Sequence, residues 1–167
     1  FLDFGAAIQA NARDKADKTA IILGETSLTW ADFGAMAAQV AGKLRAEGIG
    51  RGHYVASLAE NSVEHVVLYS AVVAAGACIV PLPFSATPEA LTRMVEDSGS
   101  RLLFASAAQR KVAEGLGAEQ VIAMETVTDW AADAEPAAPA DVAPDDLFNI
   151  IYSSGTTGLP KGILHDH

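Results

Sequence analysis

The residues best suited to chemistry lie near the end of the chain, between Ser153 and Gly162. Four hydroxyl side chains, three glycines and one lysine occur within these ten residues, directly after an apolar stretch. Glycines let the backbone approach an anion and direct successive N–H groups toward it, and the hydroxyls add further donors. Lys161 supplies a positive charge, and Pro160 stiffens its approach. The composition predicts a phosphate-binding loop, although a polar surface turn can have the same composition.

The order of the residues in this loop excludes two other motifs. A Walker loop needs Gly-Lys followed by Ser or Thr, whereas Lys161 stands between Pro160 and Gly162. A nucleophile elbow needs glycines two residues before and two residues after its serine, and neither Ser153 nor Ser154 has both. The loop is therefore neither a P-loop of the NTPase type nor a hydrolase nucleophile.

The string Ser-Ser-Gly-Thr-Thr-Gly-Leu-Pro-Lys-Gly resembles the phosphate-binding motif of the adenylate-forming (AMP-binding) superfamily. That superfamily contains acyl- and aryl-CoA synthetases, firefly luciferase and the adenylation domains of peptide synthetases. Weaker similarities extend along most of the chain, at 28–33, 48–56, 75–82 and 145–147. Two sites depart from the family pattern: His53-Tyr54 replaces the common Asp-Arg, and Pro83-Phe84 replaces Asp-Pro or Asn-Pro.

The resemblance implies a two-step reaction. A carboxylic acid attacks the α-phosphate of ATP to give an acyl-adenylate and pyrophosphate, and a thiol, usually that of coenzyme A, then takes the acyl group. Charge neutralisation by the loop and by Mg²⁺ is expected to be a large part of catalysis. Position by position, the resemblance implies that Gly158 and Gly162 allow the backbone conformation of the loop. It assigns the nucleotide contacts to Ser153, Ser154, Gly155, Thr156, Thr157 and Lys161.

No catalytic residue is expected within the chain, because the family's catalytic lysine would lie beyond His167. The chain begins with Phe1 instead of Met and ends five residues after Gly162. We therefore expect residues 1–167 to be the N-terminal portion of the AMP-binding domain of a longer enzyme, without turnover on their own. The Ser-Ser-Gly-Thr-Thr form favours acyl-CoA synthetases. A peptide-synthetase adenylation domain and a non-catalytic nucleotide-binding or interaction module remain the alternatives.

The overall composition limits the classes of partner that the chain is expected to bind. Half of the 167 residues are hydrophobic, which allows a substantial core, and the formal charge of −10 argues against nucleic acid and anionic lipid. No apolar run is long enough to span a bilayer, and no basic leader precedes one. The single cysteine, Cys78, excludes an intrachain disulfide and fits a cytoplasmic enzyme. A homo-oligomer remains possible.

Strand and helix patterns alternate along the chain, which predicts an α/β fold with a mostly parallel sheet flanked by helices. Thr29, Asn61 and Thr87 are expected to cap helices, the first with Asp32 and the second with Glu64 as reciprocal partner. A surface loop is predicted over 128–145. The expected strands are 19–23, 27–30, 54–59, 78–82, 101–105, 120–124 and 147–152, and a further helix is expected over 107–116.

Several other residues receive structural interpretations. The glycine-rich segment 48–52 ends a helix instead of following a strand, which predicts a turn and not a dinucleotide fingerprint. Cys78 is expected in the core, and His53 and His65 at the surface. His165 and His167 alternate on a predicted strand, but nothing nearby completes a metal-ligand set, so no metal site is predicted. They could instead lie near the nucleotide or in an exposed turn.

Overall fold

The computed structural model describes residues 3–154 and 160–167. Its centre is a six-stranded sheet with the order β6-β5-β3-β4-β7-β8, in which the first five strands are parallel and β8 is antiparallel to β7. The prediction of a mostly parallel sheet is confirmed. The strands are β3 (Tyr54–Leu58), β4 (Cys78–Pro81), β5 (Leu102–Ala105), β6 (Gln120–Ala123), β7 (Leu147–Ser154) and β8 (Pro160–Asp166).

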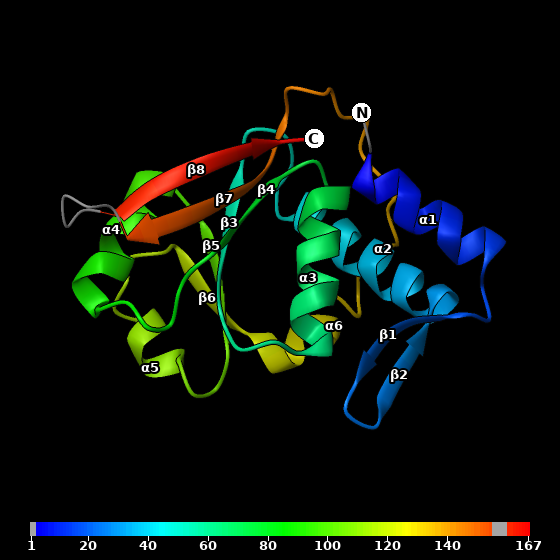
Figure 1. The fold of residues 1–167 in the computed structure, drawn as a ribbon, viewed down its shortest axis with the longest axis horizontal. Helices are drawn as coiled ribbons and strands as arrows, with labels where there is room; N and C mark the ends of the chain where they lie inside the picture. Colours follow the sequence, from blue (N-terminus) through cyan, green and yellow to red (C-terminus); the bar gives the residue numbers. More distant parts are fainter. Residues whose placement is uncertain (1–2, 155–159) are drawn as a thin grey trace.

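Helices cover both faces of this sheet (Figure 1). One face packs against α2 (Trp30–Ala46) and α3 (Val63–Ala74), with α1 (Phe4–Asp14) and the short α6 (Val127–Trp130) beside them. The other face packs against α4 (Pro88–Ser98) and α5 (Arg110–Ala113). Successive strand residues supply opposite faces, as Val55 and Ala56 do, because side chains alternate along a strand.

A separate antiparallel hairpin, β1 (Thr19–Leu23) and β2 (Thr26–Thr29), precedes the main sheet. The strands predicted over 19–23 and 27–30 are both found, but Trp30 is the first residue of α2 and not the end of a strand. Thr29 caps α2 as predicted, since its hydroxyl oxygen accepts a hydrogen bond from the Asp32 amide at 3.1 Å. None of the helices in 3–154 and 160–167 is both long and apolar enough to cross a membrane.

Two other local predictions need correction, and one helix has no counterpart among the predictions. Ser62, and not Asn61, caps α3, because its hydroxyl accepts from the His65 amide at 3.1 Å. The helix expected over 107–116 is only the four residues of α5, which Gly115 and Gly117 follow; glycine is unfavourable in a helix. The helix α1 was not predicted, although Asp3 caps it through the Ala6 amide at 2.9 Å.

The segment predicted as a surface loop, 128–145, begins within α6 and then crosses the helices (yellow to orange in Figure 1). We call residues 131–143 the strap. The strap donates backbone hydrogen bonds from Ala137 to the Ala38 carbonyl (2.9 Å) and from Ala140 to the Ala74 carbonyl (2.8 Å). These bonds are made by the main chain, which explains why the strap shows no side-chain periodicity.

Candidate functional site

The described residues of the predicted phosphate loop, 153–154 and 160–162, lie at the end of the β7–β8 hairpin. The hairpin ladder pairs Tyr152 with Gly162, Ser153 with Lys161, and Ser154 with Pro160. Ser153 and Lys161 therefore lie directly opposite each other on the two strands. The predicted contacts Gly155, Thr156 and Thr157, together with Gly158, lie outside the described residues.

This hairpin end lies at the carboxyl edge of the parallel sheet. β7 pairs with β4 at Asn149 and Ile79 and continues to Ser154, whereas β4 ends at Pro81. Ligands of open α/β sheets bind beyond the carboxyl ends of the strands. The topology therefore places Ser153 and Lys161 where a ligand of such a sheet is expected.

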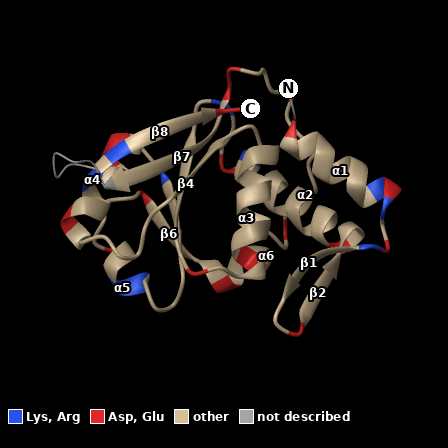
Figure 2. Cartoon of the chain, viewed as in Figure 1, with Lys and Arg blue, Asp and Glu red and all other residues tan. Residues whose placement is uncertain are grey.

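Lys161 is the second residue of β8 and its only Lys or Arg. Figure 2 shows this blue segment of β8 beside the end of the hairpin. Its side chain is exposed and forms no ion pair with any residue in 3–154 or 160–167. The Ser153 side chain opposite is also exposed. An exposed ammonium group and a hydroxyl at one hairpin end, neither of them paired among the described residues, can meet an anion without first breaking a contact there.

The hairpin has two faces of different character, because strand residues alternate. Ser153 and Lys161 share the α3 side with Asn149 and His165. Asn149 is buried, donates to the Tyr69 hydroxyl of α3 at 2.7 Å, and accepts from His165 Nδ1 at 2.7 Å. Burial raises the pKa of Tyr69, and the hydrogen bond from Asn149 partly offsets the rise. His165 is thus held by an amide, and within 3–154 and 160–167 no group of three or more His, Cys, Asp or Glu could hold a metal ion.

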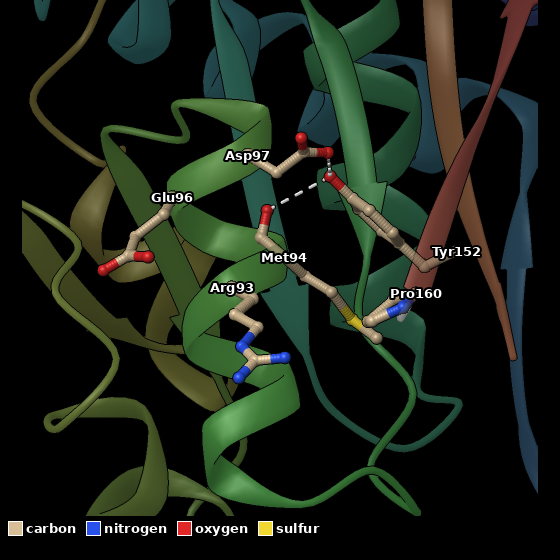
Figure 3. Close-up of a pocket in the computed structure, with 6 residues that line it drawn as sticks. All are labelled: Arg93, Met94, Glu96, Asp97, Tyr152 and Pro160. Atoms are coloured by element: carbon tan, nitrogen blue, oxygen red, sulfur yellow. Dashed lines mark hydrogen bonds between the residues drawn. The ribbon is translucent and has the colours of Figure 1, made fainter. Parts of the chain in front are cut away.

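The opposite face of the hairpin contacts α4 through Tyr152 (Figure 3). The Tyr152 hydroxyl lies 2.6 Å from Asp97 Oδ2 and 3.2 Å from the Met94 carbonyl oxygen. Burial and the Asp97 carboxylate both raise the pKa of Tyr152 above its ordinary range, so the hydroxyl stays protonated and donates. A cavity of about 430 Å³ opens beside this contact, lined by Arg93, Met94, Glu96, Asp97, Tyr152 and Pro160.

The sequence interpretation did not identify Tyr152, Asp97 or Asn149. A partial signal was present: Met94 and Asp97 are three residues apart in a helix, which places both on one side of it. The strand that receives them could not be read from local pattern, because β7 follows α4 by about fifty residues along the chain.

The other residues singled out by sequence have structural roles. The turn predicted over 48–52 is confirmed, with φ of 76° at Gly48 and 79° at Gly52. Cys78 is in the core as predicted, and burial raises the pKa of its thiol to about 12, which leaves it protonated and unreactive.

The prediction of surface histidines needs correction, because His53 and His65 are half-buried. The Nε2 atom of His65 lies 3.0 Å from Ser57 Oγ, and its Nδ1 atom lies 3.1 Å from the Glu60 carbonyl oxygen. A carbonyl oxygen only accepts, so Nδ1 carries the proton and, in the neutral ring, Ser57 donates to Nε2. Ser57 is 1% exposed, so this serine–histidine pair is structural and not a nucleophile.

Comparisons with known proteins agree with the geometry. The family model of the AMP-binding enzymes matches residues 8–167. The chain is 34% identical to the 3-hydroxybenzoate–CoA ligase of Aromatoleum sp. (strain CIB), over 93% of this chain and 32% of that protein. It is 35% identical to the long-chain-fatty-acid–CoA ligase FadD13 of Mycobacterium tuberculosis, over 86% of this chain and 30% of that protein. It is also 33% identical to a linear gramicidin synthase of Brevibacillus parabrevis, over 93% of this chain and 3% of that protein.

Solved structures match over nearly the whole chain. The ATP-bound MatB of Rhodopseudomonas palustris superposes with a TM-score of 0.84 at 33% identity, covering 99% of this chain and 35% of that one. A fatty acyl CoA synthetase of Mycobacterium tuberculosis gives a TM-score of 0.89 at 27% identity, covering 99% and 34%. The chain thus spans about a third of the CoA ligases that it matches. The extent of the family match, together with the fold and the hairpin, shows that this chain belongs to the AMP-binding enzyme family.

Proposed function

We propose that this chain is the N-terminal portion of the AMP-binding domain of an acid–CoA ligase. The complete enzyme would use ATP to convert a carboxylic acid into an acyl-adenylate with release of pyrophosphate, and would then form a thioester with coenzyme A. The supporting observation is the pairing of Ser153 with Lys161 at an exposed hairpin end on the carboxyl edge of the sheet.

The proposed role of these two residues is to bind the phosphates of ATP. A carboxylate that attacks a polyanion is repelled, so the positive charge of Lys161 lowers the barrier by offsetting phosphate charge. The Ser153 hydroxyl adds a neutral donor in the same place. The contacts assigned to Ser154, Gly155, Thr156 and Thr157 by the motif complete the proposed phosphate site.

Magnesium fits this chemistry as an ion that arrives with the nucleotide. Mg²⁺ prefers oxygen ligands and is usually bound through one or two carboxylates together with substrate phosphates and waters. The described residues contain no group of three or more His, Cys, Asp or Glu that could hold the ion without the nucleotide. When bound, Mg²⁺ would neutralise phosphate charge that Lys161 alone leaves uncompensated.

Coenzyme A is the proposed acceptor, and a carrier protein is the second candidate. Two of the named relatives are CoA ligases of an aromatic and a long-chain acid, and a third is a gramicidin synthase. The Ser-Ser-Gly-Thr-Thr form of the loop favours the CoA ligases. The cytoplasm, where ATP and coenzyme A are available, is the proposed location.

The test measures acid-dependent exchange of labelled pyrophosphate into ATP by the complete enzyme. A panel of aromatic, short-chain and long-chain acids identifies the substrate, and coenzyme A or a carrier protein is added to identify the acceptor. We expect exchange with at least one acid and a CoA thioester as product. Exchange with no acid would refute the ligase assignment, whereas loading of a carrier protein only would select the peptide-synthetase alternative.

A further inference from the structure

Tyr152 is a buried residue of β7 and directly precedes the predicted phosphate loop. Its side chain packs in the core on the α4 side, while the next residue, Ser153, is exposed. Its hydroxyl has one proton, and the shorter contact directs that proton to the Asp97 carboxylate. The Asp97 carboxylate makes no other hydrogen bond or ion pair with the described residues, so its contact with Tyr152 is not shared with a competing partner.

Gly162, the last glycine of the motif, lies opposite Tyr152 in the hairpin. A Cβ atom at Gly162 would lie 3.2 Å from Tyr152 Cε1, 3.4 Å from Tyr152 Cζ and 3.0 Å from Ile150 Cγ2. The Tyr152 ring, together with the Ile150 side chain, therefore occupies the space that a side chain at this position would need. Aromatic residues are known to cover glycines on neighbouring strands in this way. Because Gly162 has no side chain, the Tyr152 ring can pack directly on it. We call this contact the seat of the ring.

The ring packs against β8 at Gly162. Its hydroxyl contacts α4 at Asp97 and Met94 (Figure 3). β8 is an edge strand, so its position relative to the rest of the sheet depends on β7 and on α4, which it also contacts. Ser153 and Lys161 are the next residues along the two strands from this ring. A shift of the hairpin relative to α4 would move both of them together.

We propose that Tyr152 is a positioning residue, and that its ring, seated on Gly162 and hydrogen-bonded to Asp97, fixes Ser153 and Lys161 for phosphate binding. The kinetic part of this inference rests on the proposed function. The structural part concerns the hairpin alone.

The structural part is tested by amide hydrogen exchange in this 167-residue chain. Tyr152→Phe keeps the ring and removes the hydroxyl, and we expect exchange of the β8 amides that pair with β7 to accelerate about 10-fold relative to those of β3 and β5. Asp97→Ala is expected to do the same, whereas Asp97→Asn retains an acceptor oxygen and restores most of the protection. Tyr54→Phe is the matched control, since the Tyr54 hydroxyl makes no hydrogen bond to the described residues. Unchanged β8 exchange, or equal acceleration in all strands, would overturn the proposal.

A second variant disturbs the seat without removing a hydrogen-bonding group. Gly162→Ala adds a methyl group against the ring, and we expect the same local acceleration in β8. This variant keeps the proposal testable if Tyr152→Phe proves too unstable to study. Protection equal to that of the wild type in Gly162→Ala would show that the ring is not seated as inferred.

The kinetic part uses pyrophosphate exchange by the complete enzyme. We expect Tyr152→Phe to lower kcat/KM for ATP about 10-fold, because small displacements of binding groups have effects of this order. The loss should appear as a higher KM for ATP, with the KM for the acid within twofold of wild type, whereas a general loss of folding would lower kcat and leave both KM values unchanged. Equal losses for ATP and acid would count against a positioning role. A wild-type enzyme without exchange would refute the proposed function, and the hydrogen-exchange result would still decide whether Tyr152 holds the hairpin.

Discussion

The helical layer and the β7–β8 hairpin are built in opposite ways. In the helical layer, α1, α2 and α3 approach one another and the strap through small residues. The Cβ that Gly34 lacks would lie 2.5 Å from Ala12 Cβ, and the one that Gly42 lacks would lie 1.9 Å from the Glu135 carbonyl oxygen of the strap. In the hairpin, by contrast, Ile151 and Ile163 are about half exposed as a cross-strand pair, and Ser153 and Lys161 are open to solvent.

This contrast separates residues that stabilise the fold from residues available for chemistry. Close backbone packing excludes water and leaves no room for a ligand, whereas an exposed hairpin end contributes little burial but presents polar groups. The two regions meet at α3, whose Tyr69 contacts Asn149 of β7. Substitutions in the helical layer should therefore affect folding, and substitutions at the hairpin end should affect nucleotide binding.

The largest effect is expected for Gly42→Ala in α2. Alanine is intrinsically the better helix residue by about 1 kcal/mol, so helix propensity alone predicts stabilisation. The contact with the Glu135 carbonyl predicts the reverse, because the strap must move; we expect a loss of about 3 kcal/mol in the free energy of unfolding, at the upper end of overpacking costs.

Urea denaturation of the chain measures this loss. Gly50→Ala is the matched control, since its new Cβ would have only an ordinary contact of 3.6 Å with the Ala75 carbonyl oxygen. A Gly42→Ala variant as stable as the control would show that the strap does not constrain the helices.

The second effect concerns function and not stability. Lys161→Ala in the complete enzyme removes a charged contact worth about 1.5–3 kcal/mol, so adenylation should slow by roughly 10- to 150-fold. The thermal midpoint should stay unchanged, because the side chain is exposed and unpaired among the described residues. Lys111→Ala, at another exposed lysine, should leave both quantities unaltered. Pyrophosphate exchange within threefold of wild type would remove Lys161 from the phosphate site.

The contrast between the two regions also explains which features the sequence revealed. Local sequence patterns predict the parallel sheet, the helix caps Thr29 and Thr87, and the strand that leads into the loop. Burial produces a periodic hydrophobic pattern, and capping involves residues that are close in sequence. The phosphate loop was predicted from the order of residue types in its motif. The family match covers this motif.

No local sequence pattern predicts the strap or the contact between Tyr152 and Asp97. The strap is held by main-chain atoms and by the absence of a side chain at Gly42, and neither appears as a hydrophobic pattern. Tyr152 and Asp97 are brought together only when β7 inserts beside β4, which depends on the whole topology. The cap of α3 was misassigned because Asn61 and Ser62 are both good cap residues, and only the backbone geometry distinguishes them.

A smaller effect is expected where the two regions meet. Tyr69→Phe removes the acceptor of the Asn149 amide and leaves a buried donor unpaired, which should reduce the free energy of unfolding by about 1 kcal/mol. Asn149 still holds His165, so the loss should be confined to one hydrogen bond. Denaturation midpoints compared with those of Tyr54→Phe measure the difference. Equal stability of the two variants would mean that the contact between α3 and β7 is maintained by packing alone.

The smallest expected effect lies at the start of β7, where the strap ends. Arg51 donates to both carboxylate oxygens of Asp146, and the Ala143 amide donates to the same carboxylate at 2.8 Å. Arg51 and the Ala143 amide hold the pKa of Asp146 below its ordinary range. A carboxyl group whose pKa is lower in the folded state stabilises the fold above its unfolded pKa of about 3.9, and that stability is lost as the pH falls through the folded value.

Arg51→Ala should therefore lower the thermal midpoint slightly at pH 6, and the difference from wild type should vanish near pH 2. Arg13→Ala serves as the control, because Arg13 pairs with its exposed sequence neighbour Asp14, a contact that the unfolded chain can also form. The control should show no pH-dependent difference from wild type. A constant offset for Arg51→Ala from pH 2 to pH 6 would mean that Arg51 acts through packing, and that charge does not help to join the strap to β7.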